Sequence, residues 1–267
     1  MGNETPLVGK VAIVSGAAQG LGHALARALS AAGARVMIFD VQPRVEEVAA
    51  DIQTATGNRV VGMMADVSQR ADVEAVVAST QETFGGLDIL VNNAGTWRRT
   101  PVDSSWDQAL EDWDFIMDTN LKGVLMLSRA CIPLLKARGA GDIINVSTYY
   151  VLPARSEGTN QPDTDLYNAS KWALNAFTDD WAKYFLADNI RVNALCMGAT
   201  DTPMLRGFFP QGQLPPELAE VVMSSEQIAQ QMLDLLADGR TGENIGAWVD
   251  QPPGLPERAA PNRKISG

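Results

Sequence analysis

A tyrosine and a lysine four residues apart, Tyr167 and Lys171, form the pair in this sequence best suited to proton transfer. Tyrosine has an unperturbed pKa of about 10, so an isolated tyrosine is a poor base at neutral pH. A lysine one helical turn further along the same face favours the phenolate electrostatically. Tyr149 and Tyr150 have no basic residue three or four positions later. We therefore expect Tyr167 to carry the proton.

A glycine-rich turn containing Gly16, Gly20 and Gly22 lies between the first predicted strand and the first predicted helix. Such glycines let the backbone approach a pyrophosphate, and amide N–H groups at the start of the helix then bind that anion. The spacing G-x-x-x-G-x-G differs from the standard dinucleotide-binding fingerprint. A turn that serves packing alone is the alternative interpretation.

Asp40 ends the second predicted strand, twenty residues after Gly20. A carboxylate at this point accepts hydrogen bonds from the ribose hydroxyls of adenosine and repels a 2′-phosphate. Ala17 and Val41, where a basic group could receive that phosphate, are neutral. These residues favour NAD over NADP as the cofactor.

The composition argues against several other functions. The net charge of −11 disfavours nucleic acid as a partner, and no run approaches the ~18 apolar residues of a membrane span. The N-terminus lacks a signal-peptide layout, so we expect a cytoplasmic protein. Cys131 and Cys196 lie in apolar segments and are expected to be buried, reduced thiols. The one histidine, His23, argues against a His-rich metal site or a Ser-His-Asp triad, so no metal is expected.

Seven short apolar runs alternate with longer amphipathic ones and read as strands at 10–16, 35–40, 59–66, 87–93, 142–148, 190–196 and 245–250. The runs are continuously apolar, as expected for strands covered on both faces. Helical patterns at 22–33, 73–85 and 120–139 have Gly33, Gly86 and Gly139 near their expected ends. The pattern predicts an α/β fold, with residues 1–267 forming a single doubly wound, Rossmann-like domain whose seven-stranded parallel sheet is flanked by helices on both faces.

The motifs of this chain resemble the short-chain dehydrogenase/reductase family, and the likeness covers nearly all of it. They occur in the family's order: the glycine turn, "ADV" at 65–67, "NNAG" at 92–95, "NLKG" at 120–123, Tyr167-x-x-x-Lys171, and "IRVNALCMGATDTPM" at 190–204. One departure is Met197-Gly198, where the family usually has Pro-Gly.

The resemblance implies a set of NAD-binding positions: Gly16, Gln19, Gly20, Leu21, Gly22, Asp40, Asp66, Val67, Asn93, Ala94, Gly95, Tyr167, Lys171, Gly198, Thr200 and Thr202. Asp66 and Val67 are expected to border the adenine, and Lys171 to bind the nicotinamide ribose. Thr202 is expected to hold the nicotinamide carboxamide, with help from the backbone of Thr200.

The resemblance also implies a catalytic set of Asn120, Thr148, Tyr167 and Lys171. Thr148 stands where the family has the serine that orients the substrate oxygen, and a threonine can donate the same hydrogen bond. Ser147, its neighbour, is the alternative. The backbone of Asn120 is expected to hold a water of the proton relay, with a role in kinking a helix as the alternative.

The segment 151–165 and the tail 252–267 interrupt the strand–helix rhythm. Thr148 and Tyr167 are nineteen residues apart, more than is usual in the family, and "RSEGTNQPDT" reads as an insertion beside the cleft. Loop-closure entropy grows slowly with length, so the insertion is tolerable and is expected to shape substrate entry. The tail is expected to be extended and to lie on the surface.

The proposed reaction is reversible hydride transfer between NAD(H) and an alcohol or ketone. The substrate is expected to contact the insertion, residues 96–106 and a lid at 203–225, whose side chains Met204, Leu205, Phe208, Phe209, Leu214 and Leu218 suit an apolar or ring-containing molecule. Arg98, Arg99 or Arg155 could bind a substrate carboxylate, or could simply be solvated.

Two further expectations come from the same motifs. Family members commonly form tetramers through helices that correspond to 107–138 and 166–187, so a homotetramer or dimer is expected. The alternative function is a catalytically silent NAD-binding protein with a regulatory or scaffold role. Retention of Tyr167 and Lys171 argues against that alternative.

Overall fold

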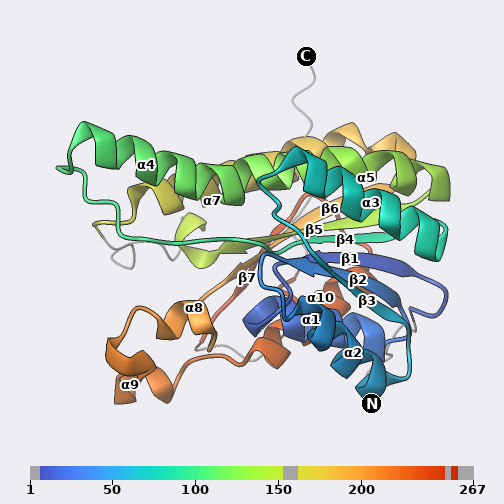
Figure 1. The fold of residues 1–267 in the computed structure, drawn as a ribbon, viewed down its shortest axis with the longest axis horizontal. Helices are drawn as coiled ribbons and strands as arrows, with labels where there is room; N and C mark the ends of the chain where they lie inside the picture. The colour runs from blue at the N-terminus through green and yellow to red at the C-terminus, as the bar shows by residue number, and fades with distance from the viewer. Residues whose placement is uncertain (1–6, 153–161, 250–253, 258–267) are drawn as a thin grey trace.

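Seven parallel strands form one sheet in the computed structural model, which describes residues 7–152, 162–249 and 254–257 (Figure 1). The strands are β1 (Val11–Ser15), β2 (Arg35–Asp40), β3 (Val60–Met64), β4 (Ile89–Asn92), β5 (Gly141–Thr148), β6 (Ile190–Met197) and β7 (Asn244–Ala247). Their order in the sheet is β3-β2-β1-β4-β5-β6-β7. This order confirms the predicted parallel, doubly wound sheet.

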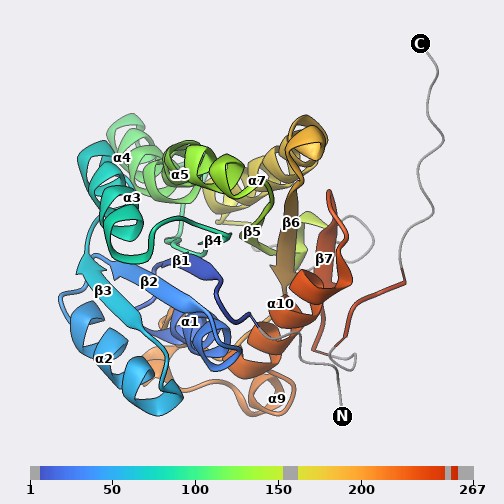
Figure 2. The ribbon, with the colours of Figure 1, turned by 90° about the vertical axis from the view of Figure 1, so that its right-hand side faces the viewer.

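Helices cover both faces of the sheet, as Figure 2 shows from its end. One layer contains α1 (Gly20–Ala31), α2 (Val45–Thr56) and α10 (Ser225–Asp238). The other contains α3 (Arg70–Phe84), α4 (Trp106–Met117), α5 (Val124–Arg138) and α7 (Asp165–Tyr184). The chain reverses its direction across the sheet between β1 and β4, and in such sheets ligands bind at the carboxyl ends of the strands beside that point.

Strand β1 explains why the apolar runs in the sequence are continuous. Ala12 and Val14 pack into the core that α1, α2 and α10 cover, whereas Val11 and Ile13 pack into the core on the opposite face. Successive side chains of a strand point to opposite faces. Cover on both sides therefore requires apolar side chains in succession, as at residues 11–14, before the strand ends at the buried Ser15.

Two helix ends differ from the sequence-based prediction. Helix α3 ends at Phe84 and its capping glycine is Gly85, not Gly86. The predicted helix 120–139 begins with a π-helical turn, η1 (Asp118–Gly123), that leads into α5. Single π-helical turns often occur at functional sites. Gly139 caps α5 as expected.

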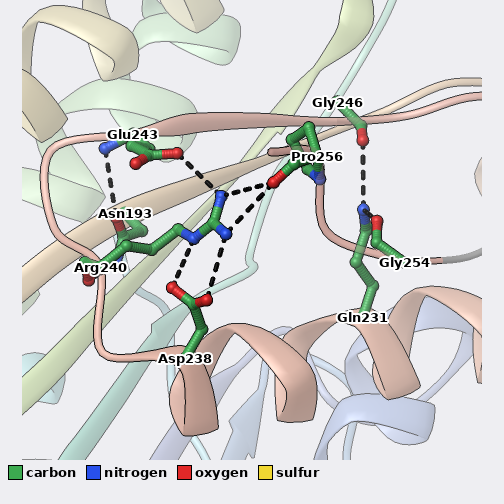
Figure 3. A network of polar contacts seen from close by, with 8 residues as sticks. All are labelled: Asn193, Gln231, Asp238, Arg240, Glu243, Gly246, Gly254 and Pro256. Atoms are coloured by element: carbon green, nitrogen blue, oxygen red, sulfur yellow. Dashed lines mark hydrogen bonds and ion pairs between the residues drawn. The ribbon is translucent and has the colours of Figure 1, made fainter. Parts of the chain in front are cut away.

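Residues 254–257 are held against the end of β7 by two side chains (Figure 3). Gln231 Nε2 donates to the carbonyls of Gly246 and Gly254, both at 3.1 Å. The guanidinium of Arg240, only 4% exposed, donates to the Pro256 carbonyl and to Asp238 and Glu243. Residues 254–257 are mostly exposed, in line with the predicted surface position, and form no helix or strand; residues 252–253 and 258–267 lie outside the described part of the chain.

Candidate active site

A cavity of about 550 Å³ opens at the carboxyl ends of the central strands. It is lined by most of the predicted site residues: Gly16, Gln19, Gly20, Leu21, Gly22, Asp40, Asn93, Gly95, Thr148, Tyr167, Lys171, Gly198, Thr200 and Thr202. The glycine turn forms one part of the wall and the tyrosine–lysine pair another. The structure therefore brings most of the predicted cofactor residues and three of the four predicted catalytic residues to one site.

The glycine turn is packed too tightly for larger residues. Gly16 has a φ of +65°, and a Cβ on it would lie 2.8 Å from Ala94 Cα. A Cβ on Gly22 would lie 2.1 Å from the Gly16 carbonyl oxygen. Asn93 Nδ2 donates to the carbonyls of Ser15 and Gly16, both at 2.9 Å. The end of β4 thus holds the turn in shape from behind.

Asp40 fixes the backbone on either side of the same turn. One carboxylate oxygen accepts from the Ala18 amide at 3.1 Å, and the other accepts from the Gln42 amide at 3.0 Å. The residue is largely buried and lines the cavity. Each carboxylate oxygen can accept more than one hydrogen bond, so Asp40 retains acceptor capacity toward the cavity.

Three predicted cofactor residues do not line the cavity. Asp66 shapes the turn after β3, because its carboxylate accepts from the Ser68 amide at 2.8 Å. Val67 packs on Gly123, where a Cβ would lie 2.8 Å from the valine side chain. Ala94 packs behind Gly16. Ala94 thus supports the glycine turn, whereas Asp66 and Val67 serve the turn after β3 and its packing on η1.

Tyr167 and Lys171 project from α7 toward β5. Lys171 is 4% exposed, and its Nζ donates to the Val146 carbonyl at 2.9 Å. The same nitrogen lies 5.8 Å from the centre of the Tyr167 ring. The side chain of Tyr167 is hydrogen-bonded to that of Thr148. A phenol, a hydroxyl and an ammonium group thus meet at the end of β5.

Burial governs both ionisable groups of this pair. Burial raises the pKa of Tyr167 to about 12, although its hydrogen bond with Thr148 acts in the opposite direction. Burial also lowers the pKa of Lys171 to about 8. Burial therefore dominates the pKa of Tyr167, and the electrostatic support that Lys171 is expected to give the phenolate stays a prediction. Desolvation disfavours the charged phenolate, and the Lys171 Nζ that donates to the Val146 carbonyl lies 5.8 Å from the centre of the ring.

The two hydroxyl residues that end β5 have different partners. Both residues line the cavity, but the Ser147 hydroxyl is directed to α7, where it donates to Asn175 Oδ1 at 3.3 Å and lies 3.5 Å from the Lys171 carbonyl oxygen. Thr148 is bonded to Tyr167. This arrangement favours Thr148 over Ser147 as the hydroxyl that orients a substrate oxygen.

Asn120 is fully buried in the π-helical turn η1 and does not line the cavity. Its Oδ1 accepts from the Thr96 amide at 2.7 Å, and its Nδ2 donates to the Thr96 carbonyl and to Ser170 Oγ. The side chain thus joins the segment after β4 to α7. These contacts support the alternative interpretation, in which Asn120 has a structural role at the π-helical turn. Its expected role in a proton relay remains a prediction.

The segment after β6 forms one wall of the cavity. It contains α8 (Pro203–Arg206), the short helix η4 (Pro210–Gly212) and α9 (Pro216–Ala219). Thr202 Oγ1 caps α8 by accepting from the Leu205 amide at 3.2 Å. Of the apolar side chains predicted to face a substrate here, Met204, Leu205, Phe208, Phe209 and Leu218 line the cavity and Leu214 does not.

Four aromatic side chains complete the wall: Trp97 and Phe208, which belong to the predicted substrate segments, and Tyr149 and Tyr150, which the prediction did not place there. Trp97 packs on Phe208 with ring centres 4.0 Å apart. Tyr149 and Tyr150 line the cavity with ring centres 4.7 Å apart. The two tyrosines directly follow Thr148, at the carboxyl end of β5. The rule that places ligands at strand ends is the signal that could have identified them.

The arginines considered as carboxylate partners have other contacts. Arg98 forms ion pairs with Glu111 and Asp112 and does not line the cavity. Arg99 lines the cavity and lies 3.3 Å from Asp163. Arg155 belongs to the predicted insertion, whose residues 153–161 lie outside the described residues.

The described residues carry neither a metal-ligand cluster nor a membrane-spanning helix. Within residues 7–152, 162–249 and 254–257, no three His, Cys, Asp or Glu side chains are grouped so that they could hold a metal ion. None of the helices in those ranges combines the length and the apolar character needed to cross a membrane. Both cysteines, Cys131 and Cys196, are buried free thiols, as predicted.

Comparison with known proteins identifies the family. The model of the short chain dehydrogenase family matches residues 10–212. The chain belongs to the short chain dehydrogenase family. This confirms the resemblance read from the motifs, and it makes the protein an oxidoreductase of a family that binds NAD(P)(H).

Similar members of the short chain dehydrogenase family carry several names. The chain is 34% identical to the oxidoreductase UcpA of Salmonella typhimurium over 218 residues, which are 82% of this chain and 79% of that protein. It is 32% identical to the 2-(R)-hydroxypropyl-CoM dehydrogenase of Xanthobacter autotrophicus, over 90% of this chain and 96% of the relative. It is also 32% identical, with the same coverage, to the 3-oxoacyl-[acyl-carrier-protein] reductase FabG of Thermotoga maritima.

The lowered pKa of Lys171 predicts a pH-dependent stability. The folded protein releases this proton near pH 8, whereas the unfolded chain retains it to about pH 10.5. The unfolded state therefore binds more protons in this window, and the free energy of unfolding rises with pH by up to about 1.4 kcal/mol per unit. The measurement is urea denaturation of the wild type and of Lys171→Met from about pH 7.5 to about pH 10. The upper limit is the ordinary pKa of tyrosine, about 10, above which ionisation of Tyr167 in the unfolded chain opposes the effect.

The difference in stability between the wild type and Lys171→Met should grow in favour of the wild type as the pH rises. Lys122→Met, which removes a half-exposed lysine that pairs with Asp118, controls for loss of a surface charge. If the free energies of unfolding of the wild type and Lys171→Met changed with pH in parallel, the burial of a charged lysine would be contradicted.

Proposed function

We propose that this protein transfers a hydride reversibly between NAD(H) and a secondary alcohol or ketone with an apolar or ring-containing body. The observation that carries the proposal is the convergence of Thr148, Tyr167 and Lys171 on the cavity that the glycine turn and Asp40 also line. The names of two relatives, a hydroxypropyl-CoM dehydrogenase and a 3-oxoacyl reductase, both describe alcohol–ketone chemistry.

The residues of the cavity fit a dinucleotide. Side chains at Gly16 and Gly22 would collide with neighbouring backbone atoms, so backbone alone faces the space in which a pyrophosphate would bind. Asp40 offers spare acceptor capacity to ribose hydroxyls. Its negative charge, beside the neutral Ala17 and Val41, supports NAD over NADP.

Each catalytic side chain has a distinct task in the proposed reaction. Thr148 orients the substrate oxygen, and Tyr167 Oη takes the proton of the alcohol hydroxyl during oxidation or returns it during reduction. Lys171 holds its charge close to the phenol and is placed to bind a ribose hydroxyl. When bound, NAD⁺ supplies the hydride acceptor and a positive charge that favours the Tyr167 phenolate.

The aromatic wall supports a ring-containing substrate. Trp97, Phe208, Phe209 and Tyr149 present flat apolar surface to the cavity, and apolar walls with a few polar groups are typical of small-molecule sites. Arg99 and Asp163 form an ion pair on the same lining. In this proposal they make one polar part of an otherwise apolar substrate site.

Replacing Tyr167 with phenylalanine tests the chemistry. Loss of the proton carrier should lower kcat for alcohol oxidation by a factor of about 10²–10⁴ while leaving the Kd for NAD within a few-fold of the wild type. The measurements are NADH absorbance across a panel of alcohols and fluorescence titration with NAD. Tyr184→Phe, a change at an exposed tyrosine, is the control. NAD binding without turnover of any alcohol by the wild type would instead favour the catalytically silent alternative.

Replacing Asp40 with asparagine tests the cofactor preference. The amide keeps an oxygen acceptor but loses the charge that repels a 2′-phosphate. The ratio of NADP to NAD affinity should therefore rise at least about tenfold, equivalent to about 1.4 kcal/mol. Glu47→Gln, which removes an exposed negative charge from α2, should leave the ratio unchanged. A wild type that binds both cofactors equally would contradict the assignment of NAD.

We also propose that the protein is a homo-oligomer, in the cytoplasm, that associates through α4 and α7. Trp106, Leu110 and Trp113 are 85%, 62% and 51% exposed. Their spacing of four and then three residues places them on one face of α4. Trp172 adds a half-exposed ring on α7, which packs beside α4. Such a concentration of exposed apolar side chains marks an interaction surface.

Light scattering tests the oligomer. The wild type should have the mass of a dimer or tetramer, and Leu110→Glu combined with Trp113→Glu should shift it to a lighter species. Val8→Glu introduces the same charge at another exposed apolar residue and should not change the mass. A monomeric wild type, or an unchanged mass in the double variant, would contradict this proposal.

A further inference from the structure

Asn175 lies on the same face of α7 as the proposed catalytic pair. Tyr167, Lys171 and Asn175 follow one another at intervals of four residues, which places them in line along a helix. Asn175 is half-buried and does not line the cavity. No step of the proposed reaction uses its side chain.

The side-chain amide of Asn175 joins three other elements. Its Oδ1 accepts from Ser147 Oγ at 3.3 Å and from Cys196 Sγ at 3.9 Å. Its Nδ2 donates to the Val151 carbonyl at 3.3 Å. A carbonyl oxygen can only accept, so the amide nitrogen must face Val151 and the amide oxygen must face the hydroxyl and the thiol. The orientation of Asn175 is therefore determined by its partners.

The Val151 carbonyl belongs to the short turn η2 (Tyr149–Val151), which carries the two tyrosines of the cavity wall. Val151 itself is buried and packs on Ala194 and Cys196. Within the turn, the Leu152 amide donates to the Tyr149 carbonyl at 3.0 Å. Asn175 thus holds the far end of the turn, and Thr148 is joined directly to its near end.

Aromatic contacts carry this restraint into the cavity. The ring of Tyr149 packs edge-on against Trp248, with centres 5.7 Å apart, and against Tyr150. A turn of three residues that is held at both ends can present these rings in only a narrow range of positions. Such rigid support is what keeps a binding site in its productive geometry.

We propose that Asn175 is a positioning residue that fixes the η2 turn, and through Tyr149 and Tyr150 sets the selectivity of the cavity for ring-containing substrates. The proposal rests on the proposed function. Loss of the amide leaves the Val151 carbonyl without this donor and lets the turn move. A movable wall still admits small alcohols, but it loses contact area with a ring.

The test compares Asn175→Leu with a matched variant on the same helix. Thr178→Val removes another buried side-chain hydrogen bond of α7, the bond from Asn145 Nδ2 at 2.9 Å, and leaves η2 untouched. Hydrogen exchange measures the amides of Tyr150 and Leu152. Steady-state kinetics with NAD measures kcat/KM for cyclohexanol and for 2-propanol.

In Asn175→Leu, exchange of the Tyr150 and Leu152 amides should accelerate at least about tenfold, equivalent to about 1.4 kcal/mol of lost protection. The ratio of kcat/KM for cyclohexanol to that for 2-propanol should fall several-fold, mainly through KM, with the Kd for NAD unchanged. Thr178→Val should change neither quantity. If Asn175 had a merely structural role, Asn175→Leu would lower kcat/KM for both alcohols by the same factor, or Asn175→Leu and Thr178→Val would have the same effects.

Unchanged exchange in Asn175→Leu, or an unchanged ratio of the two alcohols, would overturn the proposal. Failure of the proposed function has a different signature, because the wild type itself would then oxidise neither alcohol. Faster exchange in that case would still support the positioning of η2 by Asn175, and unchanged exchange would still refute it.

Discussion

Burial of the Lys171 ammonium beside Tyr167 is the constraint on which the rest of the site depends. A buried cation is costly unless hydrogen bonds compensate for the lost water, and the Val146 carbonyl supplies such a bond at 2.9 Å. Because that carbonyl belongs to β5, the bond also fixes α7 against the strand end that carries Thr148. The same burial that lowers the pKa of the lysine raises that of the phenol. In the proposed reaction, activation of Tyr167 therefore comes largely from the charge of bound NAD⁺.

Side-chain amides hold the strand ends and turns around this buried pair. Asn93 fixes the glycine turn, Asn120 ties the segment after β4 to α7, and Asn145 joins β5 to the same helix. An amide can donate and accept at once, so each one connects elements that no regular backbone ladder joins. The site is consequently preorganised by the protein's own contacts, which is the arrangement that favours electrostatic catalysis.

The sequence predicts the sheet because a strand that is buried on both faces has consecutive apolar residues, as in residues 11–14 of β1. The glycine turn and the pair Tyr167 and Lys171 are recognisable from their spacing together with the order of the surrounding motifs, and the structure places them around one cavity. The sign of the Tyr167 pKa shift could not be predicted in this way, because it depends on how deeply residues distant in sequence bury the phenol. The π-helical turn at Asn120 and the ion pairs of Arg98 depend on tertiary partners for the same reason.

Titration of Tyr167 with and without NAD⁺ tests the central claim most directly. The chain has only four tyrosines, so NMR of protein labelled with ¹³C at the tyrosine ζ carbon can resolve them, and Tyr167→Phe assigns the signal. Without cofactor, a phenol with a pKa of about 12 remains mostly neutral at pH 11, and NAD⁺ should lower that pKa. A pKa at or below the ordinary value of about 10 in the free protein, or one that NAD⁺ leaves unchanged, would contradict the account.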